Sequence, residues 1–245
     1  MIFESTAILI IVALFAVAVL YSSVGHGGAS GYLAVMALFA VAPEITRPTA
    51  LVLNLFVASI AFVQFYRAGN FDWKIFLPFA LTSIPFAFIG GSIHLPTTVY
   101  KIILGITLML AAIRLAINLK SEREINAPEV WVCLLIGAGL GLVSGLVGVG
   151  GGIFLTPILL LMNWTETKKA AGISALFILV NSVSGLLGNR AQVLQLPSTV
   201  WLWIGAAVIG GIIGATLGSY RFNSLTLRRV LAVGLLIAGI KLIFT

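Results

Sequence analysis

The sequence predicts an all-α integral membrane protein made of two inverted-topology repeats of about five transmembrane segments each, with short or broken helices at two glycine-rich motifs. Three observations predict this class. Of the 245 residues, 60% are hydrophobic and 9% are charged, whereas a soluble domain carries about 25% charged residues. Long apolar runs recur along the chain, and the two halves of the sequence align with each other.

Eight apolar runs have the character of membrane-spanning helices. They cover residues 7–21, 49–66, 75–93, 99–117, 130–147, 170–188, 200–220 and 231–244. The first run lacks the basic start and the small-residue cleavage pattern of a signal peptide, so we expect a retained helix. The lipid bilayer is therefore a predicted partner, and a homodimer is left open.

Charge and cysteine content exclude several classes of function. The net charge of +7 does not indicate nucleic-acid binding, because basic residues at the ends of membrane helices are the usual orientation signal. Cys133 is the single cysteine, which excludes an internal disulfide and a cysteine-based metal cluster, and we expect it to be buried. No cofactor and no metal site is predicted.

The repeat appears when the chain is shifted by 123 residues. This shift aligns Val24, Gly25, Gly27 and Gly28 with Val147, Gly148, Gly150 and Gly151, and Arg67 and Ala68 with Arg190 and Ala191. We therefore predict an N-terminal membrane repeat over residues 1–120 and a C-terminal membrane repeat over residues 129–245. Residues 121–128 belong to the most polar stretch and form a cytoplasmic linker.

The number of crossings decides how the halves are related. Each half has four clear helices and a short apolar piece after the glycines, at residues 32–42 and 154–162. If these pieces complete a crossing, the halves are inverted, and if they dip in and return, the halves are parallel. The positions of the basic residues distinguish these two topologies, because basic residues are enriched on the cytoplasmic side.

With the N-terminus outside and five spans per half, ten basic residues lie inside and four outside, whereas four spans per half divide them seven to seven. The ten are Arg67, Lys74, Arg114, Lys120, Arg123, Lys168, Lys169, Arg221, Arg228 and Arg229, and the four are Arg47, Lys101, Arg190 and Lys241. Ten crossings with both termini outside is the better interpretation. No charged side chain is expected at the centre of a span.

The glycines near the middle of the chain are expected to serve two purposes. Gly137, Gly139, Gly141 and Gly145 are expected to pack helices closely, since Gly141-x-x-x-Gly145 has the small-residue spacing for this. The run 148–152 is expected to be unwound, because adjacent glycines weaken a helix. A helix that restarts at Ile153 or Phe154 directs free N–H groups into a cavity and binds anions. A packing crossover without a ligand is the alternative.

Two stretches resemble a known family. "GLVGVGGGIFLTPILLL" and its degenerate copy "SSVGHGGASGYLAVMALF" resemble the signature of the sulfite exporter TauE/SafE family, although Ala34 stands where the second half has Pro157. The resemblance covers nearly the whole chain. It implies a transporter of a small sulfur-containing anion, such as sulfite or a sulfonate, in the bacterial inner membrane. In that membrane, the outside termini indicated by the basic residues are periplasmic. It does not determine which anion.

The predicted substrate-binding residues surround the two glycine motifs and the third helix of each half. They are Gly25, His26, Gly27, Gly28, Ser30, Tyr32, Asn54, Ser144, Gly148, Gly150, Gly151, Gly152, Asn181 and Ser182. Hydroxyl and amide donors suit an anion with accepting oxygens, while a serine that bonds within its own helix is the alternative. His26 either donates to the anion and carries a proton, or is neutral and bonded to a carbonyl.

Arg67 and Arg190 occupy the same repeat position and are predicted to draw anions into two vestibules, unless they only anchor the helices at the interface. An enzyme is excluded, because the chain has only two histidines and no paired-histidine, Walker or strand-linked nucleotide motif. The predicted function is secondary transport by alternating access, with proton coupling as a hypothesis. A passive anion channel is the alternative.

Overall fold

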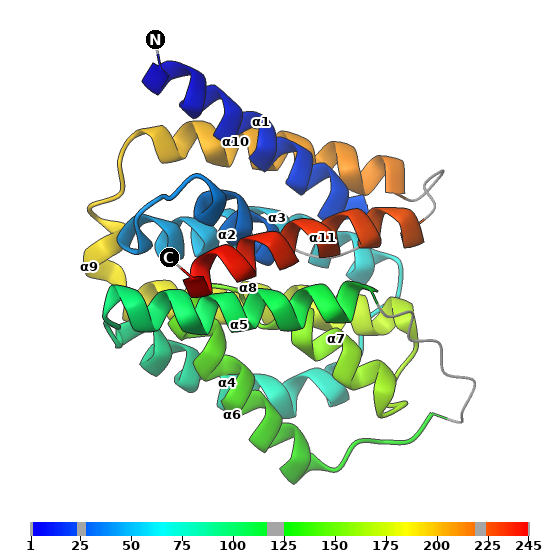
Figure 1. The fold of residues 1–245 in the computed structure, drawn as a ribbon. Helices are drawn as coiled ribbons and strands as arrows, with labels where there is room; N and C mark the ends of the chain where they lie inside the picture. Colours follow the sequence, from blue (N-terminus) through cyan, green and yellow to red (C-terminus); the bar gives the residue numbers. More distant parts are fainter. Residues whose placement is uncertain (1, 24–27, 117–124, 219–223, 245) are drawn as a thin grey trace.

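The computed structural model describes residues 2–23, 28–116, 125–218 and 224–244, and all regular structure within them is helical (Figure 1). The helices are α1 (Ile2–Ser23), α2 (Ala29–Leu38), α3 (Pro43–Arg67), α4 (Trp73–Ser92), α5 (Thr97–Ala116), α6 (Val130–Val147), α7 (Gly152–Leu161), α8 (Thr167–Gly188), α9 (Arg190–Val193), α10 (Thr199–Gly218) and α11 (Ser224–Phe244). The predicted all-α class is confirmed.

Helix length and surface composition both suit a lipid bilayer. Among the described residues, α3, α4, α6 and α8 are each long and apolar enough to cross a membrane. Large apolar side chains face outward, including Leu81 at 71%, Leu135 at 65% and Trp201 at 72% exposed. Acyl chains cover such side chains in a membrane. The chain is therefore a multi-pass membrane protein.

The order of helices in residues 130–244 resembles that in residues 2–116, except that the four-residue α9 has no counterpart. The helix α7 begins and ends 123 residues after α2 does, and each short helix has 10 residues. The first helix of each half packs mainly on the third long helix of the other half, so that α1 pairs with α10 and α6 pairs with α4. In Figure 1, these two pairs lie on opposite sides of the bundle.

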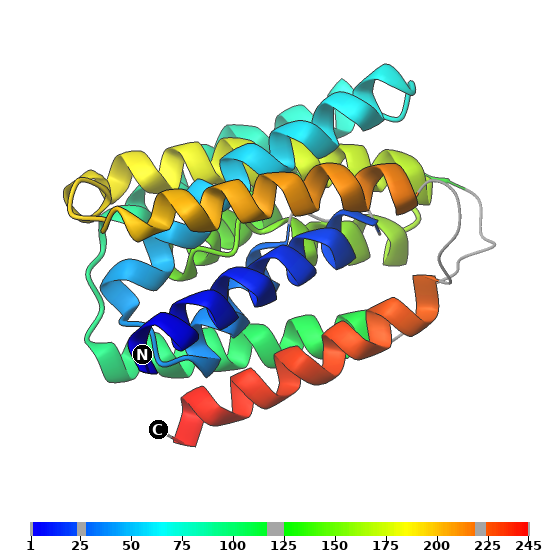
Figure 2. The same cartoon turned by 90° about the horizontal axis from the view of Figure 1, so that it is seen from above.

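The remaining helices pair across the halves at the centre and along one side. The helices α3 and α8 pack together in the interior, and α5 packs on α11. In Figures 1 and 2, the colours show that the members of each pair run in opposite directions. The short helices α2 and α7 pack on α3 and α8, respectively, which brings both glycine motifs to the central pair.

A seam of glycines joins α6 to α4. Gly137, Gly141 and Gly145 lie one turn apart, and a Cβ atom on each would collide with the backbone of Phe79, Ser83 or Ala87 of α4. Close backbone approach through small residues is a common way to pack membrane helices. The packing prediction is confirmed for these three glycines and is wrong for Gly139, which faces open space. Cys133 is buried, as expected.

Arg47 occupies an unexpected position. We expected it to be one of the four basic residues on the outer side of the membrane. In the structure it belongs to α3, and its side chain is packed within the bundle, with only 4% of the residue exposed. Its Nε donates to the carbonyl oxygen of Gly145 at 2.9 Å, and its Nη1 to that of Ile93 at 2.9 Å. Its Nη2 donates to the carbonyl oxygens of Gly90 and Gly91 at 2.6 and 2.5 Å.

These acceptors are carbonyls at the carboxyl ends of α6 and α4, which lack partners within their own helices. A guanidinium group suits this task, because it carries five donors in a rigid plane and has a positive charge that favours the negative end of a helix. Arg47 therefore binds three helices together at one point.

Replacing Arg47 with Met should lower the free energy of unfolding by at least about 3 kcal/mol, because each buried acceptor left without a donor costs about 1–3 kcal/mol. Arg47→Lys should be intermediate, since one ammonium cannot reach all the carbonyls. A denaturant titration in detergent micelles measures both. Arg67→Met, at an exposed arginine, is the control, and an equal loss in this control would contradict the role of Arg47.

The glycine seam yields a matched pair of variants. Gly141→Val should prevent recovery of a monodisperse protein in size-exclusion chromatography, because the new side chain has no room against Ser83. Gly139→Ala should leave the elution profile unchanged and raise stability by up to about 1 kcal/mol through helix propensity. Similar behaviour of the two variants would show that the seam does not depend on close approach.

Candidate functional site

The second glycine motif is an unwound segment between two helices. The helix α6 ends at Val147 and α7 begins at Gly152, so the helix restarts one residue earlier than predicted. Gly148, Gly150 and Gly151 have φ values of 88°, 79° and 75°. Glycine adopts this left-handed region without the steric penalty that other residues pay. The predicted break is confirmed, and its glycines are required by the backbone.

The first glycine motif ends in the same way. Gly28 has a φ of 83° and precedes α2, as Gly151 precedes α7. Helices of 10 residues are about 15 Å long, or half of a bilayer core. Gly25, His26 and Gly27 of the predicted site lie outside the described residues.

The two sides of the second break differ in their hydrogen bonding. On the carboxyl side, the carbonyl of Ser144 accepts from the N–H of Gly148, that of Gly145 from Arg47, and that of Val147 from the Tyr100 hydroxyl at 3.2 Å. On the amino side, the N–H groups of residues 151–153 have no backbone acceptor within the described part of the chain, and α7 has no side-chain cap. The break therefore presents donors.

A small cavity lies where the two breaks meet. It is lined by Gly28, Ala29 and Ser30 from the first break, by Val149 and Ile153 from the second, and by Tyr21 and Ile178. Its volume of about 10 Å³ has room for about one water molecule. The fold thus brings residues from both halves of the sequence to one cavity.

Two tyrosines lie on the side of the first break, of which Tyr21 lines the cavity and Tyr32 lies behind Gly28. The hydroxyls of Tyr21 and Ser30 share a hydrogen bond of 2.9 Å. Tyr32 is fully buried, and its hydroxyl has no partner within the described part of the chain. This hydroxyl lies beside Gly28, since a Cβ atom built on Gly28 would be 2.7 Å from it. An unpaired buried hydroxyl is destabilising unless another group binds it.

A second polar group lies against Gly150, between α3 and α8. The Nδ2 of Asn54 donates to the Oγ of Ser182 at 3.3 Å, and both residues are fully buried. A Cβ atom on Gly150 would be 2.9 Å from the Nδ2 of Asn54, so the glycine allows this approach. The Oδ1 of Asn54 has no partner among the described residues. Ile178 contacts Gly150 and also lines the cavity, so it lies between the cavity and the Asn54–Ser182 pair.

Other predicted residues lie away from the cavity lining. Asn181 donates to the carbonyl of Phe177 in its own helix at 2.8 Å, and its Oδ1 has no partner in the described ranges. Ser144 is buried, and its hydroxyl lacks a partner in the described ranges. Gly148 packs on the backbone of Arg47.

The three remaining predicted residues divide between the interior and the surface. Gly152 contacts Ile178. Arg67 and Arg190 are exposed at the end of α3 and the start of α9, and neither lines the cavity.

Five cavity residues were not predicted, namely Tyr21, Ala29, Val149, Ile153 and Ile178. Four are aliphatic and carry no chemical signal in an apolar sequence. Arg47 and Tyr100, which hold the end of α6, were also missed. In the sequence, Arg47 lies just before the apolar run 49–66, which placed it outside the expected helix. The helix α3 begins earlier, at Pro43, and therefore includes Arg47.

A fold of paired membrane helices, with two broken segments that meet inside the bundle, is the arrangement expected of a membrane transporter. The family model described as sulfite exporter TauE/SafE matches residues 9–242. The chain belongs to the sulfite exporter TauE/SafE family. The family description and the names of the relatives indicate a membrane transporter.

Similar proteins carry the same general description. The probable membrane transporter protein y4hK of Sinorhizobium fredii is 39% identical over 98% of this chain and 100% of its own length. The probable membrane transporter protein MJ0441 of Methanocaldococcus jannaschii is 30% identical over 73% of this chain and 70% of its own. YjnA of Bacillus subtilis, also a probable membrane transporter protein, is 26% identical over 96% and 98%. No solved structure matches.

Because the buried Tyr32 hydroxyl is unpaired among the described residues, its removal should affect the free energy of unfolding of the ligand-free protein in a specific way. Tyr32→Phe should raise the free energy of unfolding, by up to about 1–3 kcal/mol, because it removes a buried hydroxyl that has no partner within the described residues. Tyr21→Phe should lower it by about 1 kcal/mol, since its bond to Ser30 is lost. Denaturant titration in micelles compares the two. A larger loss for Tyr32→Phe would mean that its hydroxyl is already satisfied.

Proposed function

We propose that this chain is a secondary transporter that moves a small sulfur oxyanion, such as sulfite or a sulfonate, across the bacterial inner membrane by alternating access. One observation carries the proposal. Two helix starts, after Gly28 and Gly151, come to a single cavity that has an unpaired hydroxyl beside it. Paired broken helices in repeated halves are typical of a transporter's substrate site.

The chemistry beside the cavity favours an anion. The N–H groups at the start of α7 are donors without backbone acceptors in the described ranges, and a helix start carries a partial positive charge. The Tyr32 hydroxyl also donates. The cavity lining contains no carboxylate within the described residues. In this water-poor setting, donors and dipoles attract an anion more strongly than they do in water.

The preference for sulfur comes from the family. The matching family model is described as a sulfite exporter, and the oxygens of sulfite and sulfonates accept the hydrogen bonds that these donors offer. The similar proteins described above are named only as probable membrane transporters. We propose Gly28, Ser30, Tyr32, Gly150 and Gly151 as the core of the site.

The remaining predicted residues extend this proposal. Asn54 and Ser182 are proposed to join the site when Ile178 moves aside, because they lie on its other side against Gly150. Gly25, His26 and Gly27 complete the first break in the proposal, and His26 is the proposed proton carrier. Arg67 and Arg190 are proposed to attract anions at opposite ends of the bundle.

Alternating access is supported by the size of the cavity and by the pairing of the halves. A cavity for about one water molecule is too small for sulfite, which has four heavy atoms, so a substrate requires a wider state. The equivalent helices α3 and α8 run in opposite directions, as do α5 and α11 (Figures 1 and 2). These directions favour inverted repeats, in which rocking opens the site to each side in turn.

The proposed orientation places the N- and C-termini in the periplasm. Arg67 and Lys74 flank the corner between α3 and α4, where cytoplasmic basic residues are expected. An aromatic cluster of Phe62, Tyr66, Phe71, Trp73 and Phe76 occupies the same corner, and aromatic residues are enriched at membrane interfaces.

Thermal-shift screening of the purified protein against sulfite, sulfate, thiosulfate and short sulfonates tests the site. We expect at least one of these anions to raise the melting temperature, and Tyr32→Phe to reduce this shift while folding normally. Ser59→Ala is the control, because the Ser59 hydroxyl bonds within its own helix, to the Leu55 carbonyl. Stabilisation by none of the anions, or an unchanged shift in Tyr32→Phe, would contradict the proposed site.

Proteoliposomes test the mode of transport. Saturable uptake of the anion that binds would support a carrier, whereas ohmic currents in a planar bilayer would support a channel. Gly151→Val is unsuitable as a binding test, because its φ of 75° and the nearby Phe177 ring strain any larger residue. His26→Gln tests proton coupling, and an unaltered pH dependence of uptake would exclude His26 from it.

A further inference from the structure

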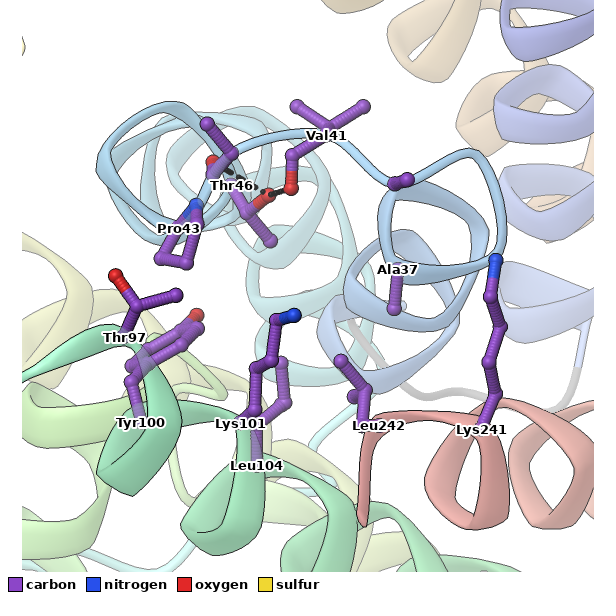
Figure 3. A pocket seen from close by; sticks show the side chains of 12 residues that line it. Ala37, Val41, Pro43, Thr46, Thr97, Tyr100, Lys101, Leu104, Lys241 and Leu242 are labelled. Atoms are coloured by element: carbon purple, nitrogen blue, oxygen red, sulfur yellow. Dashed lines mark hydrogen bonds between the residues drawn. The ribbon is translucent and has the colours of Figure 1, made fainter. Parts of the chain in front are cut away.

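A second, larger cavity opens at one end of the bundle, away from the breaks. It has a volume of about 320 Å³ and lies between the corner that joins α2 to α3, the start of α5 and the end of α11. None of its lining residues lines the cavity between the breaks. Figure 3 shows side chains from α5 and α11 pointing toward the α2–α3 corner.

Two lysines give this cavity a positive charge. Lys241 donates from Nζ to the carbonyl of Leu38 at the end of α2, at 2.7 Å. Lys101 also lines the cavity and is half-buried, and no hydrogen bond or ion pair of its side chain is found in the described part of the chain. Glu44 follows Pro43 of the lining and interacts electrostatically with Tyr100, but it is exposed and does not itself line the cavity. The ammonium group of Lys101 is therefore available to an anion.

The rest of the lining is mainly apolar. Ala37, Val41, Leu104 and Leu242 form a wall beside the lysines, and the hydroxyl of Thr97 adds a polar group at the edge (Figure 3). An inorganic ion would leave this wall uncovered, and an uncharged apolar molecule would leave Lys101 without a partner. The lining matches a molecule with an anionic head and an apolar tail.

We propose that this cavity binds an oxyanion head group that carries an apolar chain, with the head on Lys101 and the chain against Val41, Leu104 and Leu242. Two sources share this chemistry, namely an anionic phospholipid of the bilayer and an alkyl sulfonate from solution. The proposal does not rest on the transport function, because the cavity is separate from the breaks. One side chain links the cavity to the second break, because Tyr100 lines the cavity and its hydroxyl donates to the carbonyl of Val147.

Binding to the purified protein in a non-ionic detergent tests the proposal. The probes are hexane-1-sulfonate, methanesulfonate, and short-chain phosphatidylglycerol and phosphatidylcholine, measured by isothermal titration calorimetry. We expect hexane-1-sulfonate and phosphatidylglycerol to bind, and both methanesulfonate and phosphatidylcholine to bind at least about tenfold more weakly, because one lacks the chain and the other lacks net charge. Equal binding of phosphatidylglycerol and phosphatidylcholine would overturn the proposal.

Charge variants locate the binding. Lys101→Gln should weaken the binding of both anionic probes by at least about tenfold, since a hydrogen bond to a charged group is worth about 1.5–3 kcal/mol. Lys101→Arg should retain binding, and so should Lys168→Gln, at an exposed lysine on α8. Unchanged binding in Lys101→Gln would overturn the proposal. Loss in Tyr32→Phe with no effect of Lys101→Gln would do the same, because binding would then be at the breaks.

Native mass spectrometry separates the two sources. Phosphatidylglycerol that remains on the wild type and is absent from Lys101→Gln would identify a bilayer lipid as the occupant. Wild-type protein that carries no lipid but binds hexane-1-sulfonate would identify an organic anion from solution. Either result supports the site, whereas equal lipid retention by both proteins, with equal sulfonate binding, would overturn it.

Discussion

The guanidinium group of Arg47 meets the main constraint on this fold, which is that a helix ending inside a membrane must find partners for its last carbonyls. It donates to Gly145 at the end of α6 and to Gly90, Gly91 and Ile93 at the end of α4. Tyr100 adds a donor to Val147. The negative ends of two helices offset the buried charge, so a carboxylate partner is not required.

This anchoring determines where the second break lies. The glycine seam presses α6 onto α4, and Arg47 joins both helices to α3. The chain that follows Val147 therefore unwinds against α3 and α8. The repeat equivalent of Arg47 is Ala170, which is buried, so the same clamp has no counterpart at that position. Gly28 and Gly151, which precede the two short helices, match in backbone form, since both have a positive φ.

Two buried polar groups near the breaks lack hydrogen-bond partners among the described residues, and this bears on the proposed site. The hydroxyl of Tyr32 and the Oδ1 of Asn54 are buried without partners in the described ranges, and each such group destabilises the protein by about 1–3 kcal/mol. A structural core does not benefit from such groups. They become favourable when a ligand or water binds them, which is consistent with a site that is occupied during only part of a transport cycle.

The sequence by itself determined the features that depend on composition and on local backbone chemistry. Apolar runs predict membrane helices wherever they occur, and adjacent glycines at 150–152 predict an unwound segment because they lack the side chains that restrict φ. The offset of 123 residues predicts two matching short helices, and α2 and α7 have this offset. The glycine spacing predicts close packing, which Gly137, Gly141 and Gly145 provide.

Only the tertiary structure decided which of these residues meet. The bond from Asn54 to Ser182, the position of Ile178 between the breaks, and the exposed positions of Arg67 and Arg190 depend on how helices from different halves pair, which no local pattern encodes. Arg47 is the clearest case. Its residue type predicts an interfacial charge, but its acceptors are backbone carbonyls 43 to 98 residues away, and main-chain atoms leave no mark in a sequence.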